Sequence, residues 1–205
     1  MAKSAHNSRQ ALVKPARKFA PPKASRRYVA LLRGINVGGN NIIKMTDLRA
    51  SFEALGFTRV ESYIQSGNVL FCTKAASKSK LEKSIEQALC DRFDCASPVV
   101  LVSAEELKMV VDQAPSEFGK QSKLYRYDVL FVKKPLTAAE ILPQIPANPV
   151  VDTIRAGEHA VYFRRLTSKA AQSHLSKLVQ RPVYKFVTIR NWNTTTKLFE
   201  MASGE

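Results

Sequence analysis

Two polar segments contain the residues whose types and spacing best suit binding chemistry. The first is RGINVGGNN at residues 33–41, which follows an apolar stretch and precedes a helical pattern that begins near Thr46. A strand that runs into a glycine-rich turn and then a helix can hold a phosphate on backbone N–H groups. The glycine spacing matches neither G-x-G-x-x-G nor the G-K-[ST] ending of a P-loop. The segment therefore indicates an anion or polar ligand without identifying it.

The second polar segment is RNWNTTTK at residues 190–197. If Asn191 is the N-cap of a helix, its polar neighbours gather at the helix N-terminus, where the dipole and unpaired N–H groups favour an anion. These neighbours are Arg190, Asn193 and Thr194. The alternative is that Asn191 only caps the helix and that Trp192, the single tryptophan, only packs between two halves of the chain. For Trp192 we favour this second interpretation.

Catalytic groups are scarce near these segments. Neither segment contains a carboxylate, and outside the first 27 residues the two histidines, His159 and His174, lie in no motif. An odd number of cysteines without C-x-x-C argues against disulfides and zinc, so we expect reduced thiols that act as small buried hydrophobes. They are Cys72, Cys90 and Cys95. The sequence thus predicts no metal and no cofactor, assigns no catalytic residue and makes an enzyme the less favoured class.

The positive charge is unevenly placed. Residues 1–27 contain eight Lys or Arg and no Asp or Glu, so they carry more than half of the net charge of +15. Because this stretch is rich in Pro, Ala and Ser, we expect a disordered basic tail. Such a tail could attract nucleic acid or anionic lipid, act as a solubilising extension, or serve as an organelle transit peptide.

The elements from residue 28 onward follow one pattern twice. In residues 28–102 the hydrophobic periodicity predicts the order β-α-β-β-α-β. The expected strands are 28–32, 60–65, 69–72 and 99–102, of which 60–65 and 69–72 form a hairpin. The expected helices are 46–56 and one that a capping box opens at Ser79–Glu82. A linking helix starts at a second capping box, Ser103–Glu106. The expected elements of the second half are strands at 127–132, 150–154, 161–163 and 184–187, with helices near 137–142 and 171–178.

This order predicts an α+β fold of two tandem ferredoxin-like subdomains, over residues 28–102 and 103–205. Strands one and two of such a sheet run in the same direction, so loop 33–41 and the turn at 66–68 should be neighbours. A polar site would then gather Arg33, Asn36, Asn40, Ser66 and Asn68 around the glycines. The alternative is that the glycines only supply positive φ and that Gly67-Asn68 is only a hairpin turn.

Four segments resemble the hallmark motifs of the domain-of-unknown-function 1697 (DUF1697) family. They are RGINVGGNNIIKM, LxxxFExLGF, SYIQSGNVLF and TIRNWNTTTKL, and the resemblance extends over residues 27–201. It implies a soluble protein, mostly bacterial in occurrence, with two α+β subdomains of ferredoxin-like character. It assigns no accepted role to the motif positions, which here are Arg33, Gly34, Asn36, Gly38, Gly39, Asn40, Ser66, Gly67, Asn68, Arg190, Asn191, Trp192, Asn193, Thr194 and Lys197.

The favoured function is a binding module for a phosphate-bearing or nucleotide-like ligand, held by the glycine loop, the turn at 66–68 and the start of the C-terminal helix. Two alternatives stay open, namely a nucleic-acid-associated protein that uses residues 1–27 and an enzyme of unknown reaction. Because no run of 18 apolar residues occurs and the thiols are expected to be reduced, we expect a cytoplasmic protein without a membrane span.

Overall fold

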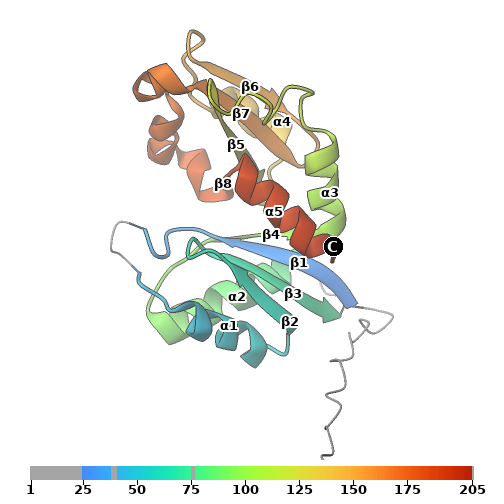
Figure 1. The fold of residues 1–205 in the computed structure, drawn as a ribbon. Coiled ribbons are helices and arrows are strands. Elements are labelled where there is room, and N and C mark those ends of the chain that lie inside the picture. The colour runs from blue at the N-terminus through green and yellow to red at the C-terminus, as the bar shows by residue number, and fades with distance from the viewer. Residues whose placement is uncertain (1–24, 38–40, 75–76, 205) are drawn as a thin grey trace, which may run out of the picture.

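Two halves with the same plan make up the computed structural model, which describes residues 25–37, 41–74 and 77–204 (Figure 1). The strands of the first half are β1 (Ser25–Leu32), β2 (Thr58–Tyr63), β3 (Asn68–Lys74) and β4 (Val99–Ser103), and those of the second are β5 (Tyr125–Val132), β6 (Asp152–Ala156), β7 (Ala160–Leu166) and β8 (Val187–Asn191). They form two antiparallel sheets with the orders β2-β3-β1-β4 and β6-β7-β5-β8. Both orders are ferredoxin-like, so the predicted fold class is confirmed.

Two helices cover one face of the first sheet, α1 (Met45–Ala54) and α2 (Lys78–Phe93). Their apolar stripes meet alternate residues of β1, because side chains on a strand point to opposite faces in turn. The contacts come from Leu48, Phe52, Ile85 and Leu89 on the helices and from Tyr28, Ala30 and Leu32 on β1. This cluster is the core of the first half.

The other face of the first sheet meets the second half through a layer of two helices, α3 (Ala104–Asp112) and α5 (Trp192–Ser203). Figure 1 shows α5 between the two sheets, with α3 beside it. One apolar cluster includes Val29 and Leu31 of β1, Leu107 and Val110 of α3, Leu198 of α5, and Val129 and Phe131 of β5. The predicted linking helix is therefore part of a core that both halves share.

The second sheet is covered on its far face by α4 (Ala138–Ile141) and by the 3₁₀ segments η1 (Leu142–Gln144), η2 (Thr167–Gln172), η3 (Leu175–Gln180) and η4 (Pro182–Phe186). The prediction of a helix at 171–178 is therefore wrong. Asp152 accepts a hydrogen bond from the backbone N–H of His174 at 2.9 Å, and Ser173 is extended, so the chain is pulled out of helical geometry between η2 and η3. The apolar spacing of Leu175 and Leu178 fits a 3₁₀ turn as well as an α-helix.

Several predicted boundaries shift. The last strand begins at Val187 rather than Tyr184, because Pro182 opens η4 before it. The N-cap of α1 is Lys44, without a side-chain bond, rather than Thr46. The capping box at Ser79–Glu82 is also wrong, since Ser77 caps α2 and a Glu82 oxygen accepts the Leu101 N–H of β4 at 3.0 Å.

Other local predictions are confirmed. Capping boxes open α3 at Ser103–Glu106 and α4 at Thr137–Glu140.

The predicted tail is shorter by three residues. Strand β1 begins at Ser25, so residues 25–27 belong to the sheet, and the rest of that tail lies outside the described residues. Cys72 and Cys95 are buried as expected, whereas Cys90 is exposed on α2. Within the described ranges, every helix is too short or too polar to cross a bilayer.

Candidate functional site

The loop after β1 lies beside the β2–β3 turn, as the strand directions predict. The Leu32 N–H donates to the Gly67 carbonyl at 2.8 Å. Asn36 adopts a positive φ of 53° and donates from Nδ2 to the carbonyls of Gln65 and Ile43, while its Oδ1 accepts the Ile43 N–H at 2.7 Å. Asn36 thus fastens the loop to the turn. Of the other predicted loop residues, Gly38, Gly39 and Asn40 lie outside the described residues.

The β2–β3 turn is tightly built. Gly67 has a φ of +76°, and a Cβ there would lie 2.8 Å from the Cβ of Leu32, so the position needs glycine for both its backbone and its space. Asn68 is fully buried and donates from Nδ2 to the Tyr63 carbonyl and to Ser66 Oγ, both at 3.2 Å. Its Oδ1 faces the second half.

Arg190, on β8 of the second half, inserts its guanidinium into this turn. Nε donates to Asn68 Oδ1 at 2.6 Å, and Nη2 donates to the carbonyls of Leu32 at 2.6 Å and Ser66 at 3.0 Å. Nη1 donates to the Ile189 carbonyl at 2.8 Å. Burial lowers the pKa of Arg190 to about 10, which leaves the side chain charged at neutral pH. Its charge is therefore compensated by amide and carbonyl oxygens.

Arg33 makes the reverse connection. From the end of β1 it donates to the carbonyls of Tyr184 and Val187 in the second half, the latter at 2.8 Å, and its guanidinium lies 4.3 Å from the centre of the Tyr184 ring. Desolvation lowers its pKa. Each half therefore contributes one arginine that donates hydrogen bonds to carbonyl groups of the other half. We call Arg33, Asn68 and Arg190, with the carbonyls they bind, the arginine tie.

The start of α5 faces an open cleft of about 370 Å³ next to the arginine tie. We call it the α5 cleft, and its lining residues are Ser122, Tyr125, Arg126, Tyr127, Asp128, Arg165, Asn191, Trp192 and Asn193. Asn191 is the N-cap, as predicted, and its Oδ1 accepts the Thr194 N–H at 2.7 Å. The N–H groups of the first two helical residues have no partner inside the helix.

Trp192 is held in one place by the layer between the sheets. Its ring packs edge-on against Phe118 with the centroids 5.1 Å apart, and a Cβ at Gly119 would lie 2.4 Å from its Nε1. Trp192 thus packs against the cluster that both halves share, through residues of the second half, and it also lines the α5 cleft. Of the other predicted residues, Thr194 is buried and Lys197 pairs with Glu200 on the exposed side of α5, at 2.9 Å.

Sequence reasoning missed the strand side of the α5 cleft. Arg126 on β5 pairs in register with Arg165 on β7, and Arg165 Nη2 lies 3.1 Å from Asp128 Oδ2. Burial raises the pKa of Asp128, although the charges of Arg165 and Arg126 oppose this. The guanidinium of Arg126 makes no hydrogen bond or ion pair with any described residue. The sequence did contain one signal for this wall of the cleft: Arg126 and Asp128 lie two residues apart, and so on one face, at the start of a strand whose later residues are apolar.

The α5 cleft suits an anion more than a metal. Two guanidinium groups and one carboxylate leave an excess of positive charge beside a helix N-terminus, where phosphate groups bind well. Across the part of the chain that the structure describes, no three His, Cys, Asp or Glu side chains gather closely enough to hold a metal ion. The chemistry on offer is therefore charge, N–H groups and aromatic surface.

Two four-stranded antiparallel sheets, joined by exchanged arginines and a shared helical layer, define an α+β protein of ferredoxin-like architecture. The profile described as "Protein of unknown function (DUF1697)" matches residues 26–162, more than half of the chain, so the protein belongs to this family. A solved structure, the conserved bacterial protein SP0830 from Streptococcus pneumoniae, is similar with a TM-score of 0.76 and 28% identity, covering 87% of this chain and 99% of that chain. A comparison with curated proteins gave no match.

Proposed function

We propose that this protein is a binding module for a phosphate-bearing or nucleotide-like ligand, and that the ligand occupies the α5 cleft. The observation that carries the proposal is the convergence of Arg126, Arg165 and the α5 N-terminus on one open cleft. Arg126 supports it most directly, since its guanidinium has no partner among the described residues although it faces this cleft. Guanidinium groups and helix N-termini are both favourable neighbours for phosphate oxygens.

The arginine tie argues for this location over the glycine loop. The Nε, Nη1 and Nη2 groups of Arg190 all donate to oxygens of the protein, and Arg33 donates across to the second half. A ligand at these groups would have to replace several buried hydrogen bonds. The tie instead holds the end of β8, and with it Asn191 and the start of α5, at a fixed position beside the cleft.

The remaining walls of the α5 cleft favour a ligand with a planar, hydrogen-bond-donating part. Trp192 and Tyr125 offer ring surface on which a base could stack. Asp128 lines the cleft, and its Oδ2 is buried in an ion pair with Arg165, which leaves Oδ1 to accept a hydrogen bond from an amino group. Phosphate, ring and amino group together describe a nucleotide-like molecule.

Trp192 provides a direct test, because it is the only tryptophan and it lines the α5 cleft. We expect saturable changes in its fluorescence on titration with inorganic phosphate and with adenosine monophosphate. Arg126→Ala should weaken binding about tenfold, the effect of losing one charge-assisted hydrogen bond. Arg181→Ala removes an exposed arginine elsewhere in the same half and should leave binding unchanged. The proposal fails if neither probe binds at millimolar concentration, or if both variants behave alike.

A second candidate function concerns residues 1–27. Eight basic residues without an acidic one favour non-specific contact with nucleic acid through counterion release. We expect the affinity for mixed-sequence RNA to fall steeply with salt and to drop when residues 1–24 are removed, which leaves β1 intact. Unchanged affinity after the deletion would exclude this role.

A further inference from the structure

The positive charge of the folded part lies in the second half. Residues 28–102 contain nine Lys and Arg and seven Asp and Glu, whereas residues 103–205 contain fifteen and ten. The excess is concentrated in residues 115–191, which contain thirteen and five. The second sheet also keeps Tyr125 on β5 and Arg164 on β7 partly open, next to one another on the face turned toward α3 and α5. The corresponding face of the first sheet is closed by aliphatic residues such as Leu31 and Leu70. A polyanion would therefore meet the second half.

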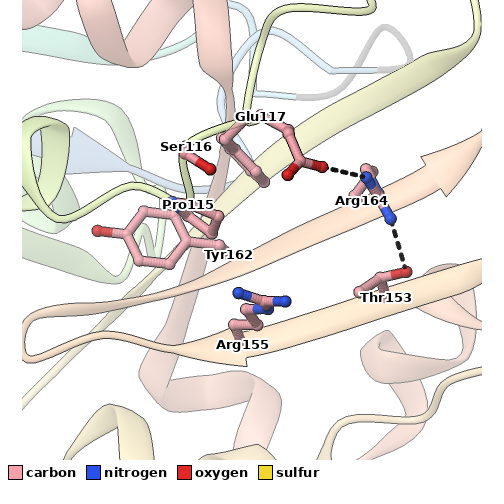
Figure 2. Close-up of a pocket in the computed structure, with 8 residues that line it drawn as sticks. Pro115, Ser116, Glu117, Thr153, Arg155, Tyr162 and Arg164 are labelled. Atoms are coloured by element: carbon pink, nitrogen blue, oxygen red, sulfur yellow. Dashed lines mark hydrogen bonds and ion pairs between the residues drawn. The ribbon is translucent and has the colours of Figure 1, made fainter.

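A second, smaller pocket lies on this face of the second sheet (Figure 2). We call it the β6–β7 pocket, and its two basic lining residues, Arg155 and Arg164, stand beside Thr153. Arg164 is engaged, since it donates to Thr153 Oγ1 at 3.4 Å and lies 3.9 Å from Glu117. Arg155 makes no hydrogen bond or ion pair with any described residue, and Figure 2 shows its guanidinium beside the other two residues without a connection. Arg155 is thus available to an anion.

Tyr125 joins the two clefts. It lines the α5 cleft, and the Arg164 guanidinium lies over its ring at 4.4 Å from the centroid. From Tyr125 the path continues through Arg164 to Arg155, crossing from β5 over β7 to β6. Neighbouring strands lie about 4.8 Å apart, so this path crosses roughly 10 Å of sheet. Consecutive strand residues point to opposite faces, so Arg126 lies on the other face of β5 from Tyr125 and Arg155, and one phosphate cannot contact both arginines. A ligand that reaches both must pass around the edge of β5, which β8 leaves unpaired before Asp128.

We propose that this path binds single-stranded nucleic acid, which rests on the proposed function of the α5 cleft. One phosphate lies in the α5 cleft near Arg126, a base stacks on Tyr125, and a following phosphate reaches Arg155. Aromatic and arginine side chains on the two central strands of a ferredoxin-like sheet are a known way to hold unpaired bases. A duplex does not fit this arrangement, because stacking on Tyr125 requires a base that is free of its partner.

The test compares chain lengths. Fluorescence anisotropy of the full chain with labelled oligothymidylates should show affinity that rises from one nucleotide to about four and then levels off. Arg155→Ala should weaken binding of an eight-nucleotide strand about tenfold and reduce its logarithmic salt slope by about one, while adenosine monophosphate binding is unchanged. Arg126→Ala should weaken both ligands. Tyr125→Leu should weaken the longer strand, and Tyr125→Phe should restore it.

Matched variants separate the possible failures. Arg181→Ala removes the same charge away from the path, so an equal loss in Arg155→Ala and Arg181→Ala would assign binding to non-specific charge and overturn the inference. If adenosine monophosphate binds but the affinity does not depend on strand length or on Arg155, the inference fails while the proposed function stands. If neither ligand binds, both fail.

Discussion

The guanidinium of Arg190 binds two segments of the other half, namely the end of β1 and the β2–β3 turn, where it contacts the Ser66 carbonyl and the side chain of Asn68. Most of these acceptors are main-chain carbonyls. A carbonyl that is left buried without a donor costs about 1–3 kcal/mol, so the value of such an arginine lies in what its removal leaves unpaired. Arg190 therefore stabilises the fold mainly because its removal would leave these buried oxygens without a donor.

We predict that Arg190→Ala lowers the free energy of unfolding by about 3 kcal/mol or more, because Asn68 Oδ1 and several carbonyls lose their donor. Arg190→Lys should lose less, since it keeps the charge but cannot reach as many acceptors. Urea denaturation followed by circular dichroism measures both, with Arg181→Ala as the control. An unchanged urea midpoint in Arg190→Ala would show that Arg190 does not hold the two halves together, and Arg190 would again be a candidate for ligand binding.

Two glycines allow backbone strain and steric overlap to be separated. Gly34 and Gly67 both have a φ near +77°, but a Cβ at Gly34 meets nothing within 4 Å, whereas one at Gly67 meets Leu32 and Ile35 at 2.8–3.1 Å. We expect Gly34→Ala to cost about 1 kcal/mol from conformation alone and Gly67→Ala clearly more. Thermal unfolding of the two variants side by side tests this. Equal losses would mean that the turn relaxes around the added methyl group.

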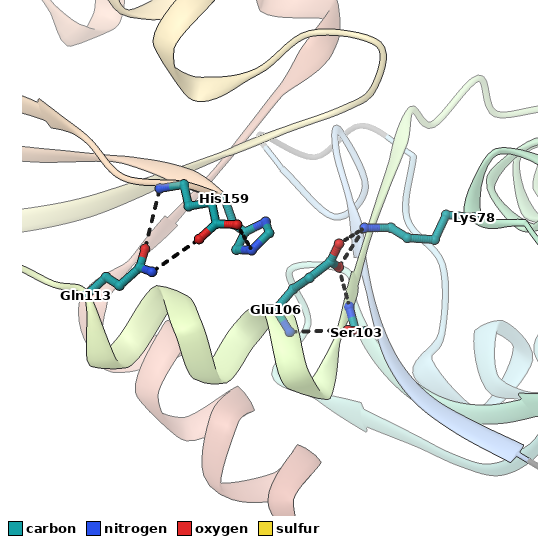
Figure 3. Close-up of polar contacts among 6 residues, drawn as sticks. Lys78, Ser103, Glu106, Gln113 and His159 are labelled. Atoms are coloured by element: carbon teal, nitrogen blue, oxygen red, sulfur yellow. Dashed lines mark hydrogen bonds and ion pairs between the residues drawn. The ribbon is translucent and has the colours of Figure 1, made fainter.

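At the scale of elements, helix α3 connects three parts of the fold through polar contacts at its two ends (Figure 3). Glu106 accepts the Ser103 N–H at 2.9 Å to complete the capping box, and it also binds Lys78 Nζ from the start of α2 at 2.6 Å. At the other end of α3, Gln113 bonds with Glu158 in the β6–β7 turn. Helix α3 is thereby fixed to the first half at one end and to the second half at the other.

This arrangement predicts a pH effect. Burial alone would raise the pKa of Glu106, but the hydrogen bonds from Lys78 and the Ser103 N–H more than offset it and lower the pKa below 4.5. A carboxyl with a depressed pKa stabilises the fold above its unfolded value and loses that contribution as the pH falls through its folded value. We expect Glu106→Gln, which keeps the capping box, to cost about 0.5–1 kcal/mol at pH 7 and clearly less at pH 3.

Urea titrations of Glu106→Gln and the unmodified chain at pH 7, 5 and 3 measure this difference. Glu106→Ala serves as the comparison, since it also removes the capping box and should stay less stable at every pH. A difference between Glu106→Gln and the unmodified chain that is as large at pH 3 as at pH 7 would show that charge is not its cause.

Several features with local signals could be predicted from the sequence, whereas features fixed by distant contacts could not. Glu82 is one of the latter, because it binds the Leu101 N–H instead of completing the predicted capping box. The capping boxes at Ser103 and Thr137 lie within four residues of chain, and both are confirmed. The break between η2 and η3 depends on Asp152, 22 residues before His174. The neighbourhood of the glycine loop and the β2–β3 turn followed from strand direction. The acceptors of Arg190 did not, because main-chain carbonyls carry no sequence signature.

At the scale of the molecule, the helical layer packs against both sheets, which predicts that the two halves unfold as one cooperative unit. Leu198 of α5 is fully buried in a cluster with residues of both sheets. We expect Trp192 fluorescence and far-ultraviolet circular dichroism to report the same urea transition, because Trp192 belongs to this layer and the sheets cannot separate without exposing it. Two separate transitions would contradict this expectation.

Leu198→Ala sharpens that prediction. It should lower the free energy of unfolding by about 2–5 kcal/mol and reduce hydrogen-exchange protection in β1 and β5 together. Leu136→Ala, at a partly buried position beside the core of the second half only, is the comparison variant. Loss of protection confined to one sheet in Leu198→Ala would show that the halves open independently.

The position of α5 in the chain also bears on how the protein is made. Synthesis proceeds from the N-terminus, so β1 to β4 with α1 and α2 leave the ribosome first, and α5 follows only after β5 to β8. Until then the face of the first sheet that carries Val29 and Leu31 has no helix α5 to cover it. Exposed apolar sheet surface attracts chaperones and promotes aggregation. The nascent first half is consequently the stage at which this protein most needs protection.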